Sequence, residues 1–298
     1  MNGEIIKLKY LAEEIQAEIS NKMVQIGTTI KMACVMVGDD QASLSYINGI
    51  KKNSEKLGII TDIINLPSDI SELELVAQII QLDKDDSYSG IIIQMPLPKH
   101  INKNEIASII DFRKDIDGVS PYNQGLLFSG RSFMIPATAW AVDIALVRLA
   151  RERNIQLAGK KALILGRSVT VGKPAFHLLL QRDITPTIAH TKSLNVEELA
   201  QDADIIVACC GVAEMVNDTW VKPGAIILDV GINSKFNAEG KSIMCGDVHT
   251  QFTADAGAIV TAVPGGIGTL TSSLLYANCL KGYFLINKNE SIVFDFEV

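Results

Sequence analysis

The sequence has few aromatic residues, few cysteines and no long apolar run. Of its 298 residues, 6% are aromatic and 48% hydrophobic, a balance typical of globular chains and not of disordered ones. The five cysteines include no C-x-x-C pair and no zinc-ligand spacing with the histidines, so we expect no metal site and a reducing compartment. No apolar stretch reaches the ~18 residues of a membrane span. We therefore expect a cytoplasmic protein with no membrane partner.

The chain also lacks an excess of basic residues. Its 27 Lys and Arg face 34 Asp and Glu, which gives a formal net charge of −7. A surface that follows nucleic-acid phosphates needs clustered Lys and Arg, so we expect no nucleic-acid partner. The first 15 residues mix acids and lysines instead of joining a basic patch to an apolar run, so no signal peptide is expected.

Apolar periodicity predicts alternating helices and buried strands in the first half. Helices are expected at 8–24, 42–57 and 71–82, and strands at 31–38, 59–66 and 90–94. This order is typical of a parallel sheet covered by helices.

A second series of strands follows the loop-rich stretch 115–137 and a helix at 138–150. The expected strands are 161–165, 187–190, 204–209, 225–230 and 258–261, and a last helix covers 267–285. The chain is thus predicted to be α/β with two domains, each an open, mainly parallel sheet with flanking helices, the second of Rossmann type. Residues 1–137 with 272–298 are expected to form the first domain, and residues 138–271 the second.

The segment ALILGRSVTVGKP, residues 162–174, is the most informative local motif. A strand ends at Gly166 and a helix begins near Val171, which presents backbone N–H groups and a positive dipole end to a phosphate. The pattern GxSxxxG is a variant of the dinucleotide fingerprint. A tight strand-to-helix turn without a ligand is the alternative.

The turn after the next strand, IAHTKS, favours NADP over NAD. NAD-selective sites place an acid there for the ribose hydroxyls, and this turn has none. Arg167, Thr191 and Lys192 are instead candidates to surround a ribose 2′-phosphate. Lys192 as a solvated loop lysine, and NAD as the cofactor, remain open at this point.

Polar residues follow a buried strand of the first domain. Gln94 ends the strand, at the edge where open α/β sheets bind ligands. Asp115 and Asp117, in the loop KDIDGVSPYNQG, are candidate acceptors for a ring N–H and an amino group.

The octapeptide SYINGIKK places Tyr46 on a predicted helix shortly before two lysines. Residues four apart share a helix face, so Tyr46 is paired with Ile50, whereas Lys51 and Lys52 point elsewhere. An apolar side chain stands where a reactive amine is expected.

Together these segments resemble the methylenetetrahydrofolate dehydrogenase/cyclohydrolase family, the FolD-type folate enzymes, over nearly the whole chain. The matching segments, in chain order, are VGDDQASLSYI, GIIIQMPLP, KDIDGVSPYNQGLL, GRSVTVGKP, ADIIVACCG, KPGAIILDVGIN, GDV and VPGGIGTLT. The resemblance implies oxidoreductase and hydrolase activities of one-carbon metabolism, a folate substrate on the first domain, NADP on the second and a homodimer. It also implies two reactions, hydride transfer to nicotinamide and hydrolysis of the resulting methenyl group.

The resemblance also implies roles for individual residues. Tyr46, Gln94 and Asp117 match active-site residues of the family, catalytic and substrate-binding. Further residues implied to bind substrate form the Pro-Gly-Gly turn: Pro264, Gly265 and Gly266. Those implied to bind the cofactor lie on the nucleotide-domain loops: Gly166, Arg167, Ser168, Gly172, Thr191, Lys192, Gly211 and Ile232.

The family's essential lysine, assigned to the proton transfers of the cyclohydrolase, stands four residues after the tyrosine. Here that position is Ile50. A π-bulge at Gly49 would bring Lys51 onto the tyrosine face, but the count from Tyr46 to Gly58 agrees with the family and leaves no spare residue. We expect a dehydrogenase with weak or absent cyclohydrolase activity.

Three alternatives stay open. A fully bifunctional enzyme would use Lys51 or water-mediated groups. A non-catalytic relative would bind folate or nucleotide without turnover, and is motivated by further departures from the family at 138–141, Ala262 and 269–270. A two-domain dehydrogenase of the shikimate dehydrogenase type would need its own lysine and aspartate pair, which the first domain does not reveal.

Overall fold

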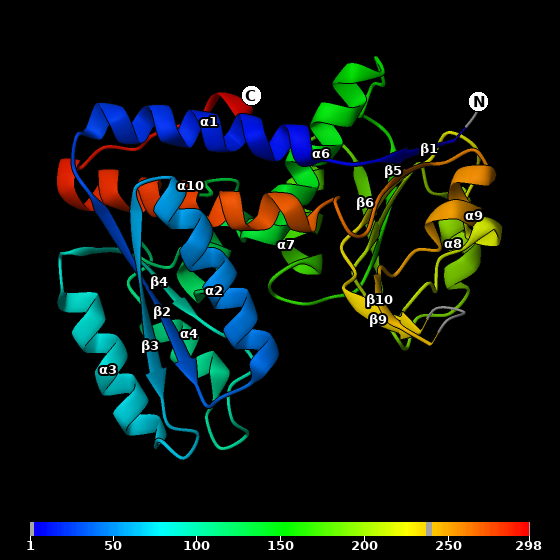
Figure 1. The fold of residues 1–298 in the computed structure, drawn as a ribbon. Helices are drawn as coiled ribbons and strands as arrows, with labels where there is room; N and C mark the ends of the chain where they lie inside the picture. Colours follow the sequence, from blue (N-terminus) through cyan, green and yellow to red (C-terminus); the bar gives the residue numbers. More distant parts are fainter. Residues whose placement is uncertain (1–2, 237–239, 298) are drawn as a thin grey trace. The chain divides into compact units, whose positions relative to one another are not determined.

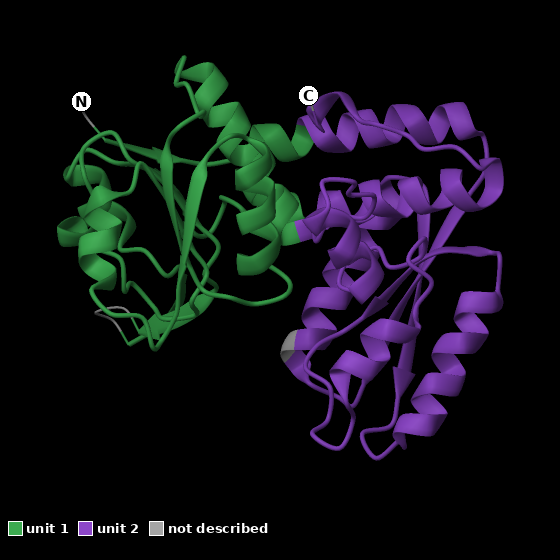
Figure 2. Cartoon of the chain, turned by 180° about the vertical axis from the view of Figure 1, so that it is seen from behind, with its two compact units in different colours: residues 1–13, 138–271 green, residues 14–137, 272–298 purple. Residues whose placement is uncertain are grey.

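The computed structural model describes residues 3–236 and 240–297. The chain forms two compact units, drawn in separate colours in Figure 2. Unit 1 comprises residues 1–13 and 138–271, and unit 2 comprises residues 14–137 and 272–298. Both have the predicted α/β architecture, with a parallel sheet and flanking helices.

Unit 2 is built on a three-stranded parallel sheet in the order β3-β2-β4. Its strands are β2 (Ile30–Val37), β3 (Ile59–Leu66) and β4 (Tyr88–Ile93). The helices, several of which are labelled in Figure 1, are α1 (Lys9–Ile26), α2 (Gln41–Lys56), α3 (Glu72–Lys84), α4 (Lys103–Ile109), α5 (Pro121–Phe128) and α10 (Gly268–Lys288), with a 3₁₀ turn at Asp295–Glu297. The unit boundaries fall inside α1, α10 and the helix Ala137–Glu152 (α6).

Local sequence fixes these elements. The central strand IKMACVMV is almost wholly buried, as expected for a parallel strand covered on both faces. Helix α2 begins where the Asp40 side chain accepts the Ser43 N–H, and α3 begins at a reciprocal capping box between Ser71 and Glu74. Apolar residues of β2, β4, α3 and α4 then close one core.

Unit 1 holds a six-stranded parallel sheet in the order β1-β11-β8-β7-β5-β6. Its strands are β1 (Glu4–Ile6), β5 (Lys161–Leu165), β6 (Thr185–Ala189), β7 (Ile205–Ala208), β8 (Ile226–Asp229) and β11 (Ile259–Thr261), beside a hairpin of β9 (Asn233–Phe236) and β10 (Ser242–Cys245). The helices are α6 (Ala137–Glu152), α7 (Gly172–Gln181), α8 (Val196–Asp202) and α9 (Thr250–Asp255), with a 3₁₀ turn at Asp218–Trp220.

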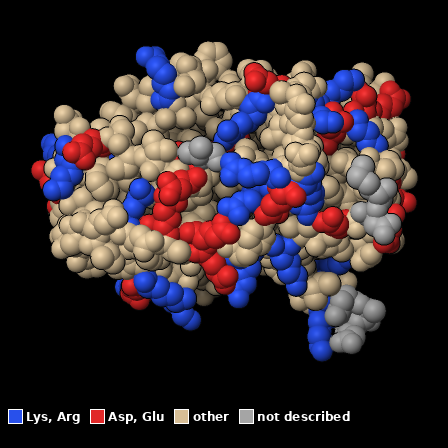
Figure 3. Space-filling model, turned by 90° about the horizontal axis from the view of Figure 1, so that it is seen from above, with Lys and Arg blue, Asp and Glu red and all other residues tan. Residues whose placement is uncertain are grey.

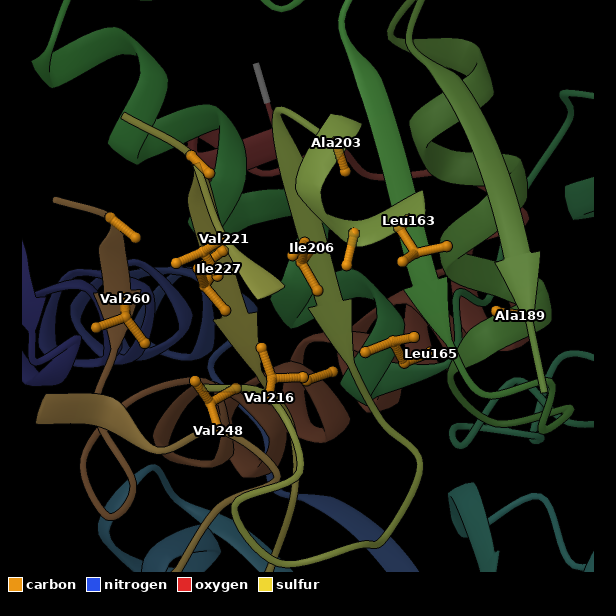
Figure 4. Close-up of a cluster of buried hydrophobic side chains, with 14 of the residues drawn as sticks. Leu163, Leu165, Ala189, Ala203, Ile206, Val216, Val221, Ile227, Val248 and Val260 are labelled. Atoms are coloured by element: carbon orange, nitrogen blue, oxygen red, sulfur yellow. The ribbon is translucent and has the colours of Figure 1, made fainter. Parts of the chain in front are cut away.

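Side chains from neighbouring strands and from loops at the strand ends pack together in the core of unit 1. Leu163, Ile206 and Ile227 come from β5, β7 and β8 and line the sheet face shown in Figure 4. Val216 and Val248 join the cluster from loops that a backbone bridge ties together. The core therefore anchors the connections at the ends of the strands as well as the strands themselves.

The start of the chain departs from the expected domain boundary. Residues 1–13 were assigned to the first domain but belong to unit 1, because β1 pairs in parallel with β11 and extends its sheet. A three-residue strand is too short to give a periodic signal. The stretch 115–137, expected as loop, contains α5, which begins at the Ser120 cap with Pro121 in its first turn.

None of the described helices is long and apolar enough to cross a bilayer. On the face drawn in Figure 3, basic and acidic side chains lie interspersed.

Helix α10 is tied to the rest of unit 2 by a buried asparagine. The Nδ2 group of Asn278 donates to the carbonyl oxygens of Ile116 (2.8 Å) and Ile135 (2.9 Å), and the residue is fully buried. Both carbonyls depend on this side chain, since neither lies in a helix or strand.

Asn278→Ala should destabilise the chain by roughly 2–4 kcal/mol, because it leaves two buried carbonyls unpaired and opens a cavity. Urea unfolding measures the loss. The control is Asn287→Ala on the exposed end of the same helix, where Nδ2 bonds only the Tyr283 carbonyl. Equal effects of the two substitutions would contradict the role of Asn278.

Candidate active site and dinucleotide loop

Helix α2 and the end of β4 meet at one carbonyl group in unit 2. Gln94 follows β4, and its backbone N–H continues the sheet by donating to Val35 O at 2.8 Å. The Gln94 Nε2 group and the Ser43 hydroxyl both donate to the Met95 carbonyl, at 2.7 and 3.4 Å. Tyr46 lies on the same helix, three residues after Ser43. The carboxyl edge of the sheet thus brings Gln94 and the tyrosine helix together, where open α/β sheets bind ligands.

Tyr46 occupies a partly solvent-accessible position on α2. The side chain is 46% exposed. Loss of hydration, with the negative charge of Asp117 as the next cause, raises the pKa of Tyr46 to about 12. Tyr46 and Asp117 are therefore electrostatic neighbours, and the tyrosine stays a neutral hydrogen-bonding group at neutral pH.

Asp117 occupies a loop that its neighbour Asp115 holds in shape. The buried Asp115 carboxylate accepts the N–H groups of Val119 (3.1 Å) and Ser120 (2.8 Å) and the Asn123 amide (2.8 Å). These bonds occupy Asp115, a candidate ligand acceptor from the sequence, within its own loop. Burial, with the Asp115 charge adding to it, raises the pKa of Asp117 to about 7.

The position four residues after Tyr46 is apolar and buried. Helix α2 is α-helical through all 16 of its residues, so the structure contains no π-bulge that would rotate Lys51 onto the tyrosine face. Ile50 is 2% exposed. The pKa of Asp62 on β3 is lowered, first by a hydrogen bond from Tyr88 and in part by the charge of Lys51. Lys51 is half-buried and Lys52 is exposed.

A second tyrosine lies beneath this helix, and sequence reasoning missed it. The Tyr276 hydroxyl, from α10, donates to the Ile50 carbonyl at 2.8 Å in a fully buried contact. Burial raises the pKa of Tyr276, and the charges of Tyr46 and Cys34 raise it further. Tyr276 therefore holds the helix that carries Tyr46 through a hydroxyl that is neutral at pH 7.

The loop between β5 and α7 has the geometry of an anion-binding turn. A Cβ atom on Gly166 would collide with the Cys209 carbonyl and one on Gly172 with the Gly166 carbonyl, so only glycine allows this close packing. The Ser168 Oγ accepts the Val171 N–H at 3.0 Å at the start of the helix. Backbone N–H groups of residues 168–170 are exposed and meet no acceptor among the described residues. These donors fit a dinucleotide phosphate.

The turn after β6 is closed by its own side chains. His190 N–H donates to the Ser193 Oγ at 3.0 Å, and Lys192 N–H donates to His190 Nδ1 at 3.1 Å. Thr191 and Lys192 are exposed as a result, and Arg167 is exposed on the neighbouring loop. The sheet order places β6 directly beside β5, so both turns lie at the same edge.

Three further predicted residues end other strands of unit 1 or follow them. Gly211 (φ +71°) follows β7 with open space around it, and Ile232 follows β8 and is 72% exposed. In the Pro-Gly-Gly turn after β11, the Gly265 carbonyl accepts the Leu8 N–H at 2.8 Å. The N-terminal segment therefore helps to hold that turn.

The described residues contain no group of three or more His, Cys, Asp or Glu side chains arranged to hold a metal ion.

Comparisons with known proteins identify the family of this chain. Residues 6–117 match the catalytic domain, and residues 136–285 the NAD(P)-binding domain, of tetrahydrofolate dehydrogenase/cyclohydrolase. The chain belongs to this family. The family assignment made from the sequence motifs is thereby confirmed.

Individual relatives cover nearly the whole chain. Bifunctional protein FolD from Listeria innocua is 38% identical over 282 residues, which is 94% of this chain and 96% of the relative. A methylenetetrahydrofolate dehydrogenase-cyclohydrolase from Trypanosoma brucei, solved with an NADP cofactor and an inhibitor, is 27% identical with a TM-score of 0.87 and coverages of 95% and 98%. A 5,10-methylenetetrahydrofolate dehydrogenase from the silkworm Bombyx mori is 32% identical with a TM-score of 0.86 and coverages of 97% and 100%.

The Asp117 carboxyl group should titrate near pH 7 instead of near pH 4, because burial and the Asp115 charge disfavour its ionised form. Carbon NMR of chain labelled at its aspartate side chains measures the midpoint, and Asp117→Asn assigns the signal. A midpoint below pH 5 in the folded chain would contradict the environment described here.

Proposed function

We propose that the chain is an NADP-dependent methylenetetrahydrofolate dehydrogenase whose methenyltetrahydrofolate cyclohydrolase activity is weak or absent. The observation that carries the proposal is the buried Ile50 one helical turn after Tyr46, in a unit that retains Gln94 and Asp117. The silkworm relative is described as a dehydrogenase and the Listeria relative as bifunctional, so relatives of both descriptions are similar to this chain.

Hydride transfer makes modest demands on protein side chains. The methylene carbon of the folate gives up a hydride and becomes a methenyl cation, and NADP, when bound, supplies the hydride acceptor. The rate depends mainly on holding the two molecules in a reactive orientation. In the proposal, Asp117 accepts hydrogen bonds from the folate ring, and Tyr46 and Gln94 position it.

Hydrolysis of the methenyl group makes a different demand. Water adds to the methenyl carbon and loses one proton, and the hydroxyl of the adduct then loses the second as the carbon–nitrogen bond breaks and the ring nitrogen gains a proton. One proton is released overall. A positioned acid–base group typically contributes 10²–10⁴-fold to such a step. Ile50 cannot carry a proton, and Tyr46, with a pKa of about 12, is a weak acid. The proposal therefore keeps the first reaction and loses most of the second.

A fully bifunctional enzyme is the second candidate, favoured by the name of the Listeria relative. It requires Lys51 or water-mediated groups to move the protons. The uninterrupted helix α2 speaks against that lysine, because it rotates Lys51 away from the face that carries Tyr46. Hydrolysis by the wild-type chain that Lys51→Ala abolishes would select this candidate.

We further propose a homodimer, which the family resemblance implies, and a cytoplasmic location, which the cysteine pattern and the lack of a long apolar run predict. Support for a dimer comes from β3, which forms one edge of the sheet of unit 2, since a free edge strand can pair with a second chain. Sedimentation measures the oligomeric state.

Ile50→Lys should create or raise methenyl hydrolysis by at least about tenfold. A lysine at this buried place would have its pKa lowered by loss of hydration, which suits proton transfer near neutrality. The matched control is Ile50→Met, which has similar length and no amine and should leave hydrolysis unchanged. No gain in a folded Ile50→Lys variant would count against the argument from the helix face.

Lys192→Ala should raise the KM for NADP by about tenfold and leave the KM for NAD unchanged, since a lost charge-assisted phosphate contact affects only the phosphorylated cofactor. Lys161→Ala is the control, because this exposed lysine lies at the opposite end of β5 and pairs with Asp202. Parallel changes for both cofactors would show that Lys192 does not select NADP.

A further inference from the structure

Two buried carboxyl groups lie beneath the strand ends of unit 1, and the proposed reaction does not use either. Asp229 ends β8, and Asp247 follows β10; both are at most 1% exposed. Together they accept hydrogen bonds from three different connections of the sheet. Buried carboxylates are costly unless they are saturated with donors, so such an arrangement requires an explanation.

Asp247 accepts hydrogen bonds from two connections that lie far apart in the sequence. One carboxylate oxygen, Oδ2, accepts the N–H groups of Cys210 at 2.7 Å and Gly211 at 2.9 Å, in the connection after β7. The other oxygen, Oδ1, accepts the Asn233 Nδ2 group at 2.8 Å, directly after the β8 connection. One side chain thus bonds two connections of the sheet, through backbone N–H groups after β7 and through a side-chain amide after β8.

Asp229 in turn fixes Asp247. Its Oδ1 accepts the N–H groups of Gly231 at 2.9 Å and Asp247 at 3.0 Å, and its Oδ2 accepts the Val248 N–H at 3.1 Å. The backbone on both sides of Asp247 is therefore held, and the direction of its carboxylate is determined by the donors around it. A Cβ atom on Gly231 would collide with the Asp247 carboxylate, so the β8 connection packs directly against this group.

We propose that Asp247 is a positioning residue for the dinucleotide, because it presents the β7 and β8 connections that carry Gly211 and Ile232. Both residues are exposed, and the Gly211 N–H is one of the groups that the Asp247 carboxylate holds. The inference rests on the proposed function and on the cofactor-binding role that the family resemblance implies for these two residues. Asp247 does not touch the cofactor; it determines where the backbone that does so lies.

The experiment compares three purified chains for binding of NADP by calorimetry, without folate and without turnover. Asp247→Ala leaves the Cys210 and Gly211 N–H groups without their acceptor and frees Asn233, so the Kd for NADP should rise about tenfold or more. Asp247→Asn keeps one oxygen for the two N–H groups, and the Asn233 amide can rotate to accept from the new NH₂ group. Its Kd should stay within about threefold of the wild-type value.

Two controls separate positioning from a general loss of stability. Asp204→Ala removes a carboxylate at the opposite end of β7, where it accepts the Lys161 N–H and pairs with Lys222, and should lower Tm without changing the Kd for NADP. Binding of tetrahydrofolate to the Asp247→Ala variant should equal that of the wild-type chain. If Asp247→Ala does not fold, Asn233→Ala replaces it, with an expected rise in Kd of about threefold.

Several results would overturn the inference. They are an unchanged Kd for NADP in folded Asp247→Ala or in its substitute Asn233→Ala, a parallel loss of NADP and tetrahydrofolate binding, and an Asp247→Asn variant as weak as Asp247→Ala. A wild-type chain that binds no NADP would refute the proposed function first, and the inference with it.

Discussion

Hydrogen bonds from one buried helix hold the two segments of unit 2 on which the proposed chemistry depends. From α10, Tyr276 bonds the Ile50 carbonyl of α2, and Asn278 bonds the Ile116 carbonyl immediately before Asp117. Helix α2, which carries Tyr46, and the loop that carries Asp117 are therefore both hydrogen-bonded to α10. Reactions that depend on orientation more than on acid strength need this kind of support, because small displacements of a positioning group are costly in rate.

The electrostatic character of the site follows from the same packing. Burial keeps the Tyr46 and Tyr276 hydroxyls protonated, and Ile50 contributes no charge. Asp117 is the ionisable group among them that changes its charge near neutral pH. A site of this composition can accept hydrogen bonds from a folate ring and tolerate the positive charge that develops when a hydride leaves. It offers little to a reaction that must supply and remove protons.

Much of the fold and part of the candidate site were predictable from short sequence patterns. The alternation of apolar strands and helices gave the α/β class, and GRSVTVGKP predicted the turn whose free N–H groups the structure describes. Three-residue β1 and the polar hairpin β9–β10 carry too little periodicity to be found. Asp115 was expected to accept hydrogen bonds from a ligand, but its carboxylate accepts hydrogen bonds from its own loop instead. The contacts of Tyr276 and Asp247 join segments distant in the sequence, so no local pattern encodes them.

The most direct measurement is a single progress curve of the wild-type chain with methylenetetrahydrofolate and NADP. NADPH is followed by its fluorescence and methenyltetrahydrofolate by its absorbance. We expect one methenyltetrahydrofolate to accumulate for each NADPH and to decay no faster than in buffer alone. NADPH formation with rapid enzymatic consumption of the methenyl compound would contradict the loss of cyclohydrolase activity, and no NADPH at all would contradict the dehydrogenase itself.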